Sequence, residues 1–139
     1  MLICYEAIFA GLARQRAALG ADFLVNITND AWFGDTSAPH QHLALAAIRA
    51  VETRRPVVRV ANTGVSAVVG ADGEIHGETA LFEAATRVLA VRGTGHVTFY
   101  VRHGDVFAGV ASLVAAALFV YASWGTPTTT DVEPLRVGT

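Results

Sequence analysis

Apolar and polar positions alternate along the first part of the chain in short runs separated by helical periods. Leu2 to Cys4 and Phe23 to Ile27 are apolar runs that predict buried strands. Between them, apolar residues recur at helical spacing from Ile8 to Leu19, and Gly20 is a typical end of a helix. Strand, helix and strand in this order predict a βαβ unit with parallel strands.

The pattern continues with a second helix and further strands. Ser37 is the predicted N-cap of a helix that runs to about Arg54, and Pro56 ends it. The composite pattern predicts an α/β sheet with helices packed on it. The further predicted strands are Val57 to Ala61, Thr86 to Val91, and Ser66 to Val69, the last followed by the hairpin turn Asp72-Gly73.

One segment is far more apolar than the rest of the chain. Val106 to Trp124 contains no charged residue. A helix of this length nearly matches the ~30 Å hydrocarbon thickness of a bilayer. We therefore expect a transmembrane helix over residues 105–124, with a buried core helix as the alternative. Residues 1–104 are expected to form one globular domain, and residues 125–139, rich in Thr and Pro, a disordered tail.

Charge and cysteine content exclude several classes of function. Ten basic residues against twelve acidic ones give a formal net charge of -2, which does not fit a nucleic-acid-binding protein. The single cysteine, Cys4, excludes an internal disulfide and any metal centre built from several cysteines. All ten basic residues are arginines. The chain by itself therefore cannot complete a mechanism that needs a lysine amine.

Cys4 lies where a predicted strand passes into a predicted helix. The first N–H groups of a helix favour a thiolate and can receive an oxyanion, so this position suits a nucleophile. The alternative is a free cysteine that only packs in the core. Glu6 is either a first-turn partner of the helix dipole or an acid–base group.

Two motifs near the start of the chain add a family resemblance. Leu2-Ile3-Cys4-Tyr5-Glu6, followed by Asn26 to Phe33 (NITNDAWF), resembles the nitrilase superfamily, which uses a cysteine nucleophile with a glutamate base and a lysine. A narrower resemblance, to the apolipoprotein N-acyltransferases, covers residues 2–124. It depends on further residues and motifs: His40 to Leu43, Arg49, Glu52, Arg55, Pro56, Arg59, Asn62 to Ser66, Tyr100, Arg102, Gly104 and Asp105.

The resemblance implies a fold and a reaction. The fold is the C-terminal half of a nitrilase-like αββα sandwich, followed by one transmembrane helix. In the implied reaction, Cys4 takes an acyl chain from a phospholipid as a thioester and passes it to the N-terminal amine of a diacylglyceryl-apolipoprotein. Tyr5 and Glu6 support the site. The loop with Trp32 and Phe33 is a candidate for contact with acyl chains, and for Trp32 the alternative is a hydrophobic plug on the sheet.

The same resemblance implies a cellular location, and the chain differs from the family pattern in one respect. The nitrilase-like domain is expected on the extracytoplasmic side of the bacterial inner membrane, whereas the distribution of arginines around the apolar span favours the cytoplasm. The family's glutamate and lysine precede the cysteine and are not found here. We therefore expect a C-terminal fragment that is inactive alone. The alternatives are a soluble nitrilase-type amidase and an inactive single-pass membrane fragment.

The remaining polar features have structural interpretations. His40 and His42 are two residues apart, so on a helix they point in different directions and make helix-start contacts instead of sharing a metal. Arg49 and Glu52 are an i,i+3 pair, either solvated or, as the resemblance favours, structural. Asn62-Thr63-Gly64 predicts a turn that needs the backbone freedom of Gly64, with proximity of this loop to the site as the alternative. No metal and no cofactor are expected.

Overall fold

The computed structural model describes residues 1–125, and the chain divides into two compact units, Met1–Gly104 and Asp105–Thr139. The first unit contains a five-stranded sheet in the order β1-β2-β3-β4-β5. β1 pairs with β2 and β2 with β3 in parallel, whereas the pairs β3–β4 and β4–β5 are antiparallel. The strands are β1 (Leu2–Ile3), β2 (Leu24–Asn29), β3 (Val57–Asn62), β4 (Ala67–Val69) and β5 (Ile75–His76).

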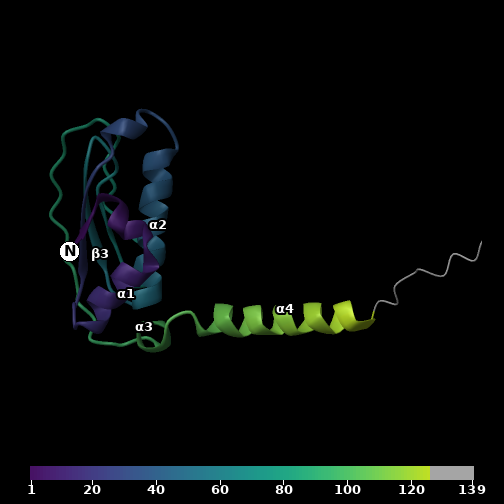
Figure 1. The fold of residues 1–139 in the computed structure, drawn as a ribbon. Coiled ribbons are helices and arrows are strands. Elements are labelled where there is room, and N and C mark those ends of the chain that lie inside the picture. The colour runs from purple at the N-terminus through teal and green to yellow at the C-terminus, as the bar shows by residue number, and fades with distance from the viewer. Residues whose placement is uncertain (126–139) are drawn as a thin grey trace, which may run out of the picture. The chain divides into compact units, whose positions relative to one another are not determined.

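The parallel pairing confirms the predicted βαβ unit, and the β4–β5 pair confirms the hairpin at Asp72-Gly73. Helices α1 and α2 lie on the same face of the sheet (Figure 1). The helical elements are η1 (Cys4–Ile8), α1 (Ala10–Ala18), η2 (Ala31–Phe33), α2 (Ala38–Thr53), α3 (Phe99–His103) and, in the second unit, α4 (Val106–Gly125). This arrangement is the mixed α/β fold that the sequence predicts.

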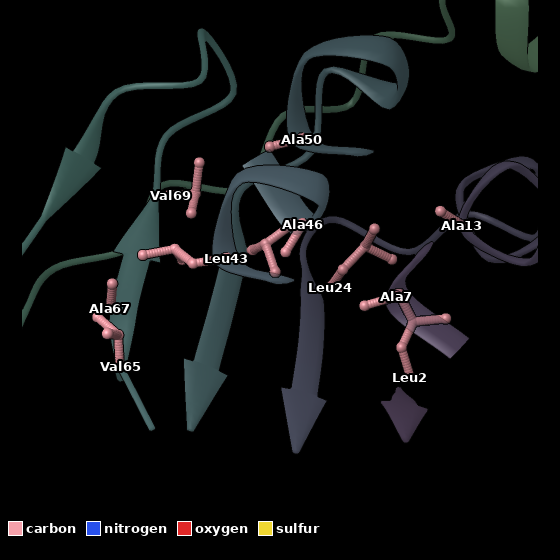
Figure 2. Packing of buried hydrophobic residues seen from close by; sticks show 11 residues of the cluster. Leu2, Ala7, Ala13, Leu24, Leu43, Ala46, Ala50, Val65, Ala67 and Val69 are labelled. Atoms are coloured by element: carbon pink, nitrogen blue, oxygen red, sulfur yellow. The ribbon is translucent and has the colours of Figure 1, made fainter. Parts of the chain in front are cut away.

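The core lies between α2 and the strands. The register aligns Leu24 with Val57, and Val57 with Val69, so these residues form one apolar row across the sheet. All three are at most 1% exposed. Figure 2 shows that Leu43 and Ala46 of α2 lie over this part of the sheet. Burial of such a layer supplies most of the favourable free energy of folding.

Two predicted elements differ from the structure. The expected helix from Ile8 to Leu19 is interrupted at Phe9, which has an extended backbone (φ -86°, ψ 105°) between η1 and α1. The expected strand from Thr86 to Val91 is not a strand, because the segment forms no ladder with the sheet and Val88 is 95% exposed. Strand composition alone does not supply a pairing partner.

Tyr100 and Arg102 of the motif noted in the sequence lie in α3, which is hydrogen-bonded to α1. Arg14 of α1 donates from Nε to the carbonyl oxygens of Tyr100 and Val101, both at 3.0 Å. Gly104, with φ 73°, ends α3, and a Cβ at this position would lie 3.3 Å from the guanidinium carbon of Arg14. The carbonyl oxygen of Tyr100 also accepts from the backbone N–H of Gly104 at 2.7 Å, whereas that of Val101 is one of the last carbonyls of the helix, which a guanidinium can satisfy.

The second unit contains α4. Val106–Trp124 is long and apolar enough to cross a membrane, judged by length and composition, and no part of it is buried in the protein. It is therefore compatible with a membrane span. The predicted tail, residues 125–139, lies outside the described residues except for Gly125, which belongs to α4.

Candidate active site

Cys4 begins η1 at the carboxyl end of the parallel strand β1. Its backbone has φ 49°, a left-handed conformation that costs free energy for a residue with a Cβ, and its side chain is partly exposed. The side-chain amide of Asn26, on the neighbouring strand, donates to the carbonyl oxygens of Leu2 and Cys4, both at 3.3 Å. The start of η1, which carries the thiol and is called the cysteine turn, is therefore held in place by a side chain of β2.

A buried chain of polar side chains continues from Asn26. Arg59 of β3 donates from Nη1 to Oδ1 of Asn26 and from Nη2 to Oδ2 of Asp30, both at 2.6 Å. Asn26 and Asp30 are at most 1% exposed, and so is Arg59. Arg59 also donates from Nε to the carbonyl oxygen of Val65 at 3.3 Å. Charged groups this deeply buried are stable only when they are paired and hydrogen-bonded, and this pair meets that condition.

Asp30 has two further partners. Its Oδ1 accepts a hydrogen bond from the hydroxyl of Thr28 at 2.9 Å and faces Nδ1 of His42 at 3.1 Å. His42, on α2, stacks on the ring of Tyr5 with the centroids 5.4 Å apart, and Phe33 meets both rings edge-on. The carboxylate and the three rings thus connect α2 and the loop after β2 to the cysteine turn.

Burial and charge both act on the ionisable groups of this network. Burial lowers the pKa of His42 below its usual 6.5, and the positive charge of Arg59 lowers it further, while Asp30 opposes both. Burial also lowers the pKa of the Arg59 guanidinium, and Asp30 counteracts this. His42 is therefore neutral at pH 7. Because an ionised carboxylate only accepts, Nδ1 of the neutral ring carries the proton that is donated to Asp30.

The lowered pKa of His42 predicts a loss of stability in mild acid. The folded chain binds fewer protons than the unfolded one, so the free energy of unfolding falls as the pH drops below 6.5, until the folded state is also protonated. We expect the thermal midpoint of the full chain in detergent, followed by near-ultraviolet circular dichroism, to fall between pH 7.5 and pH 5.5. His42→Gln should flatten this dependence, and the exposed His40→Gln should keep it. An undiminished pH dependence in His42→Gln would refute the assignment.

Gly64 allows the loop after β3 to approach Asp30. A Cβ on Gly64 would lie 2.5 Å from Oδ2 of Asp30, closer than any real contact. The left-handed residue of this turn is Thr63 (φ 57°), not Gly64. The predicted turn is therefore present, but Gly64 is needed for close approach to the carboxylate and not for backbone freedom.

The structure brings together only some of the residues that the sequence singled out. Tyr5 and Phe33 are in contact, with ring centroids 6.2 Å apart. The carboxylate of Glu6 accepts a hydrogen bond from the backbone N–H of Ile3 at 2.8 Å, so it bridges the cysteine turn. Trp32 is 80% exposed, and its indole N–H donates to the carbonyl oxygen of Asn29. It is therefore not a plug on the sheet.

Sequence reasoning missed most of the network under Cys4. His42 is a buried partner of Asp30 and not a helix-start contact, because α2 turns this side chain toward the sheet. A signal was available in the alternation of the strands. Asn26 and Arg59 occupy the buried parity of β2 and β3, where Leu24 and Val57 are apolar, and the register pairs them directly. Polar residues at core-facing strand positions indicate a buried polar site.

Arg49 and Glu52 form a structural pair. Arg49 is 7% exposed and donates to the carbonyl oxygen of Ile8 and to Glu52, both at 3.1 Å. The contact ties α2 to the end of η1, as the family resemblance favoured. Among residues 1–125, no three His, Cys, Asp or Glu side chains lie close enough together to hold a metal ion.

Comparison with known proteins shows the family to which this chain belongs. The family of carbon-nitrogen hydrolases matches residues 1–94. A crystal structure of an amidase from Nesterenkonia sp. is similar at 29% identity, over 58% of this chain and 32% of the amidase, with a TM-score of 0.45. The match over residues 1–94 covers most of the chain, so the chain belongs to the carbon-nitrogen hydrolase family.

More specific similarity is to apolipoprotein N-acyltransferases. The chain is 47% identical over 123 residues to that of Geobacter metallireducens, which is 86% of this chain and 24% of the relative. It is 61% identical over 72 residues to that of Sinorhizobium medicae, which is 52% of this chain and 13% of the relative. These matches confirm the resemblance inferred from the motifs. The chain spans a quarter or less of the length of these curated relatives.

Proposed function

We propose that this chain carries the nucleophile of a lipoprotein N-acyltransferase. The observation that carries the proposal is the position of Cys4, the single cysteine of the chain, in a left-handed turn at the carboxyl end of a parallel strand. Side chains presented at this edge of a parallel sheet are accessible to substrates. The similarity to apolipoprotein N-acyltransferases supports the acyl-transfer chemistry.

The proposed reaction has two steps. The Cys4 thiolate attacks the carbonyl carbon of a phospholipid ester, the ester C–O bond breaks, and the lysophospholipid alcohol leaves with a proton. The N-terminal amine of a diacylglyceryl-apolipoprotein then attacks the thioester, forms an amide and releases the Cys4 thiol. A thioester is activated enough for an amine to cleave, and exclusion of water from the site limits hydrolysis.

The surroundings of Cys4 suit this division of roles. Glu6 bridges the turn through the N–H of Ile3, and Tyr5 is held against His42, so both support the site. Trp32 is 80% exposed next to Phe33, which packs edge-on against Tyr5. We propose that this aromatic loop contacts the acyl chains, because exposed aromatic rings favour the boundary between water and lipid.

The proposed organisation includes a membrane and a second segment. Residues 1–104 form the C-terminal part of a nitrilase-like domain, and residues 105–124 anchor it in the bacterial inner membrane, with the domain on the extracytoplasmic side. The chain contains no lysine. The lysine of the family mechanism therefore comes from a separate polypeptide segment. No cofactor takes part.

A chimera tests the proposal directly. The matching segment of the Geobacter metallireducens relative is replaced by this chain, and the purified chimera is incubated with vesicles of phospholipid carrying a radiolabelled acyl chain. We expect a label on Cys4 that hydroxylamine releases and that a diacylglyceryl-cysteine peptide removes. This chain alone should acquire no label, because it contains no lysine. An unlabelled chimera that hydrolyses small amides would instead favour an amidase.

A further inference from the structure

The side chain of Asn26 makes three hydrogen bonds while 0% exposed. Its Nδ2 donates to the carbonyl oxygens of Leu2 and Cys4, and its Oδ1 accepts from Arg59. The carbonyl of Leu2 lies two residues before the nucleophile, Cys4, and the other carbonyl belongs to Cys4 itself. One amide therefore contacts the backbone on both sides of the left-handed turn.

We infer that Asn26 is a positioning residue for the Cys4 thiol, fixed in its orientation by Arg59, which is fixed in turn by Asp30. The inference rests on the proposed function, because it assigns the side chains that hold the nucleophile of that reaction. The assignment requires none of the three to touch the reacting sulfur. Asn26 acts through the backbone of the turn, and Arg59 acts both through Asn26 and through its charge.

The direction of the Asn26 amide follows from the charge beside it. An amide has a donor end and an acceptor end, and the Arg59 guanidinium can only donate. Oδ1 must therefore face Arg59, and Nδ2 must face the two carbonyl oxygens. A carboxylate at position 26 would keep the bond to Arg59 but would place a lone pair, and no donor, against both carbonyls.

The strained backbone of Cys4 explains why the hydrogen bonds from Asn26 matter. A residue with a Cβ at φ 49° persists only where its surroundings hold it. Arg59 adds an electrostatic effect, because its positive charge and a Cys4 thiolate attract each other. Within residues 1–125, the charged or titratable groups that contact η1 or its partners include Tyr5 and Glu6 from η1, Arg59 from β3, Asp30 from the loop after β2, and His42 and the pair Arg49–Glu52 from α2.

The single cysteine allows a direct measurement. Iodoacetamide alkylation of the full chain in detergent reports on Cys4 alone. In Asn26→Asp we expect the rate at pH 7.0 to fall by about tenfold, because two hydrogen bonds become repulsive contacts and a negative charge is added near the thiolate. At pH 9.5, where thiols ionise with little assistance, the ratio of wild-type to variant rate should shrink toward one. Asn62→Asp, the same change at an exposed position of β3, should leave the rate unchanged.

A purely structural role makes the opposite prediction. Unfolding exposes the thiol, so a variant that merely unfolds would be alkylated faster, at the rate of the chain in urea. Such a faster rate would overturn the inference. An unchanged rate, or a ratio of wild-type to variant rate that is equal at both pH values, would also overturn it. Arg59→Lys provides a second measurement. A single ammonium cannot donate to Asn26 and Asp30 in the same fork geometry, so we expect a smaller fall at pH 7.0 with the positive charge retained. If wild-type Cys4 stays unreactive toward iodoacetamide at pH 9.5 as well as at pH 7.0, the thiol is inaccessible and the proposed function fails independently of Asn26.

Discussion

Replacement of Arg59 by methionine is expected to lower the free energy of unfolding by about 3–5 kcal/mol, the usual cost of removing one partner from a buried ion pair. Among the described residues, the Arg59 guanidinium is the only cation bonded to Asp30. Both side chains are 0% exposed. Methionine fills a similar volume but leaves the carboxylate without a counter-charge. Two other acceptors, Oδ1 of Asn26 and the carbonyl of Val65, also lose a donor.

Urea denaturation of the full chain in detergent measures this effect. Arg87→Met is the matched control, because Arg87 is exposed and, among residues 1–125, bonds only to the neighbouring Thr86 carbonyl. It should change the free energy of unfolding by no more than about 0.5 kcal/mol. The double variant Arg59→Met with Asp30→Leu should recover part of the loss, because it removes the unpaired charge. A change below about 1 kcal/mol in Arg59→Met would show that the pair does not hold the site together.

Removal of the Cys4 thiol is expected to have the largest effect on activity. In the Geobacter metallireducens chimera, Cys4→Ala should lower acyl transfer at least about a thousandfold, because no covalent intermediate can form. The side chain is only partly buried and makes no hydrogen bond in the described structure, so its loss should leave the thermal midpoint almost unchanged. Transfer of radiolabelled acyl chains from phospholipid vesicles to a diacylglyceryl-cysteine peptide provides the measurement.

The matched variant for this test is Cys4→Ser. Serine keeps the shape and a hydroxyl, but a hydroxyl ionises far less readily than a thiol, so transfer should remain close to that of Cys4→Ala. Any residual acyl group on the serine would be an ester, which is more resistant to hydroxylamine than a thioester. Undiminished transfer by Cys4→Ala would exclude the covalent mechanism, whatever the family of the protein.

The sequence predicted the local structure around the candidate nucleophile, because the residues concerned are neighbours in the chain. Cys4, Tyr5 and Glu6 are consecutive, and a strand followed by a helical turn places them at the edge of the sheet. The interpretation of His42 as a helix-start contact was wrong. For Gly64, the role in backbone freedom was wrong, and the alternative, proximity of its loop to the site, is confirmed. Both residues are explained by Asp30, which comes from a different segment of the chain.

The alternation of apolar and polar residues by itself determined the strands β2 and β3, the helix α2, the parallel βαβ unit and the long apolar helix α4. These features depend on the repeat of the helix or strand and on the length of an apolar run, and both can be read from neighbouring residues in the sequence. Only the tertiary structure decided that Thr86 to Val91 is not a strand and that Asn26, Arg59 and Asp30 form one buried network. Strand register and the pairing of buried charges depend on which distant segments meet, because such groups are stable only beside partners from other elements.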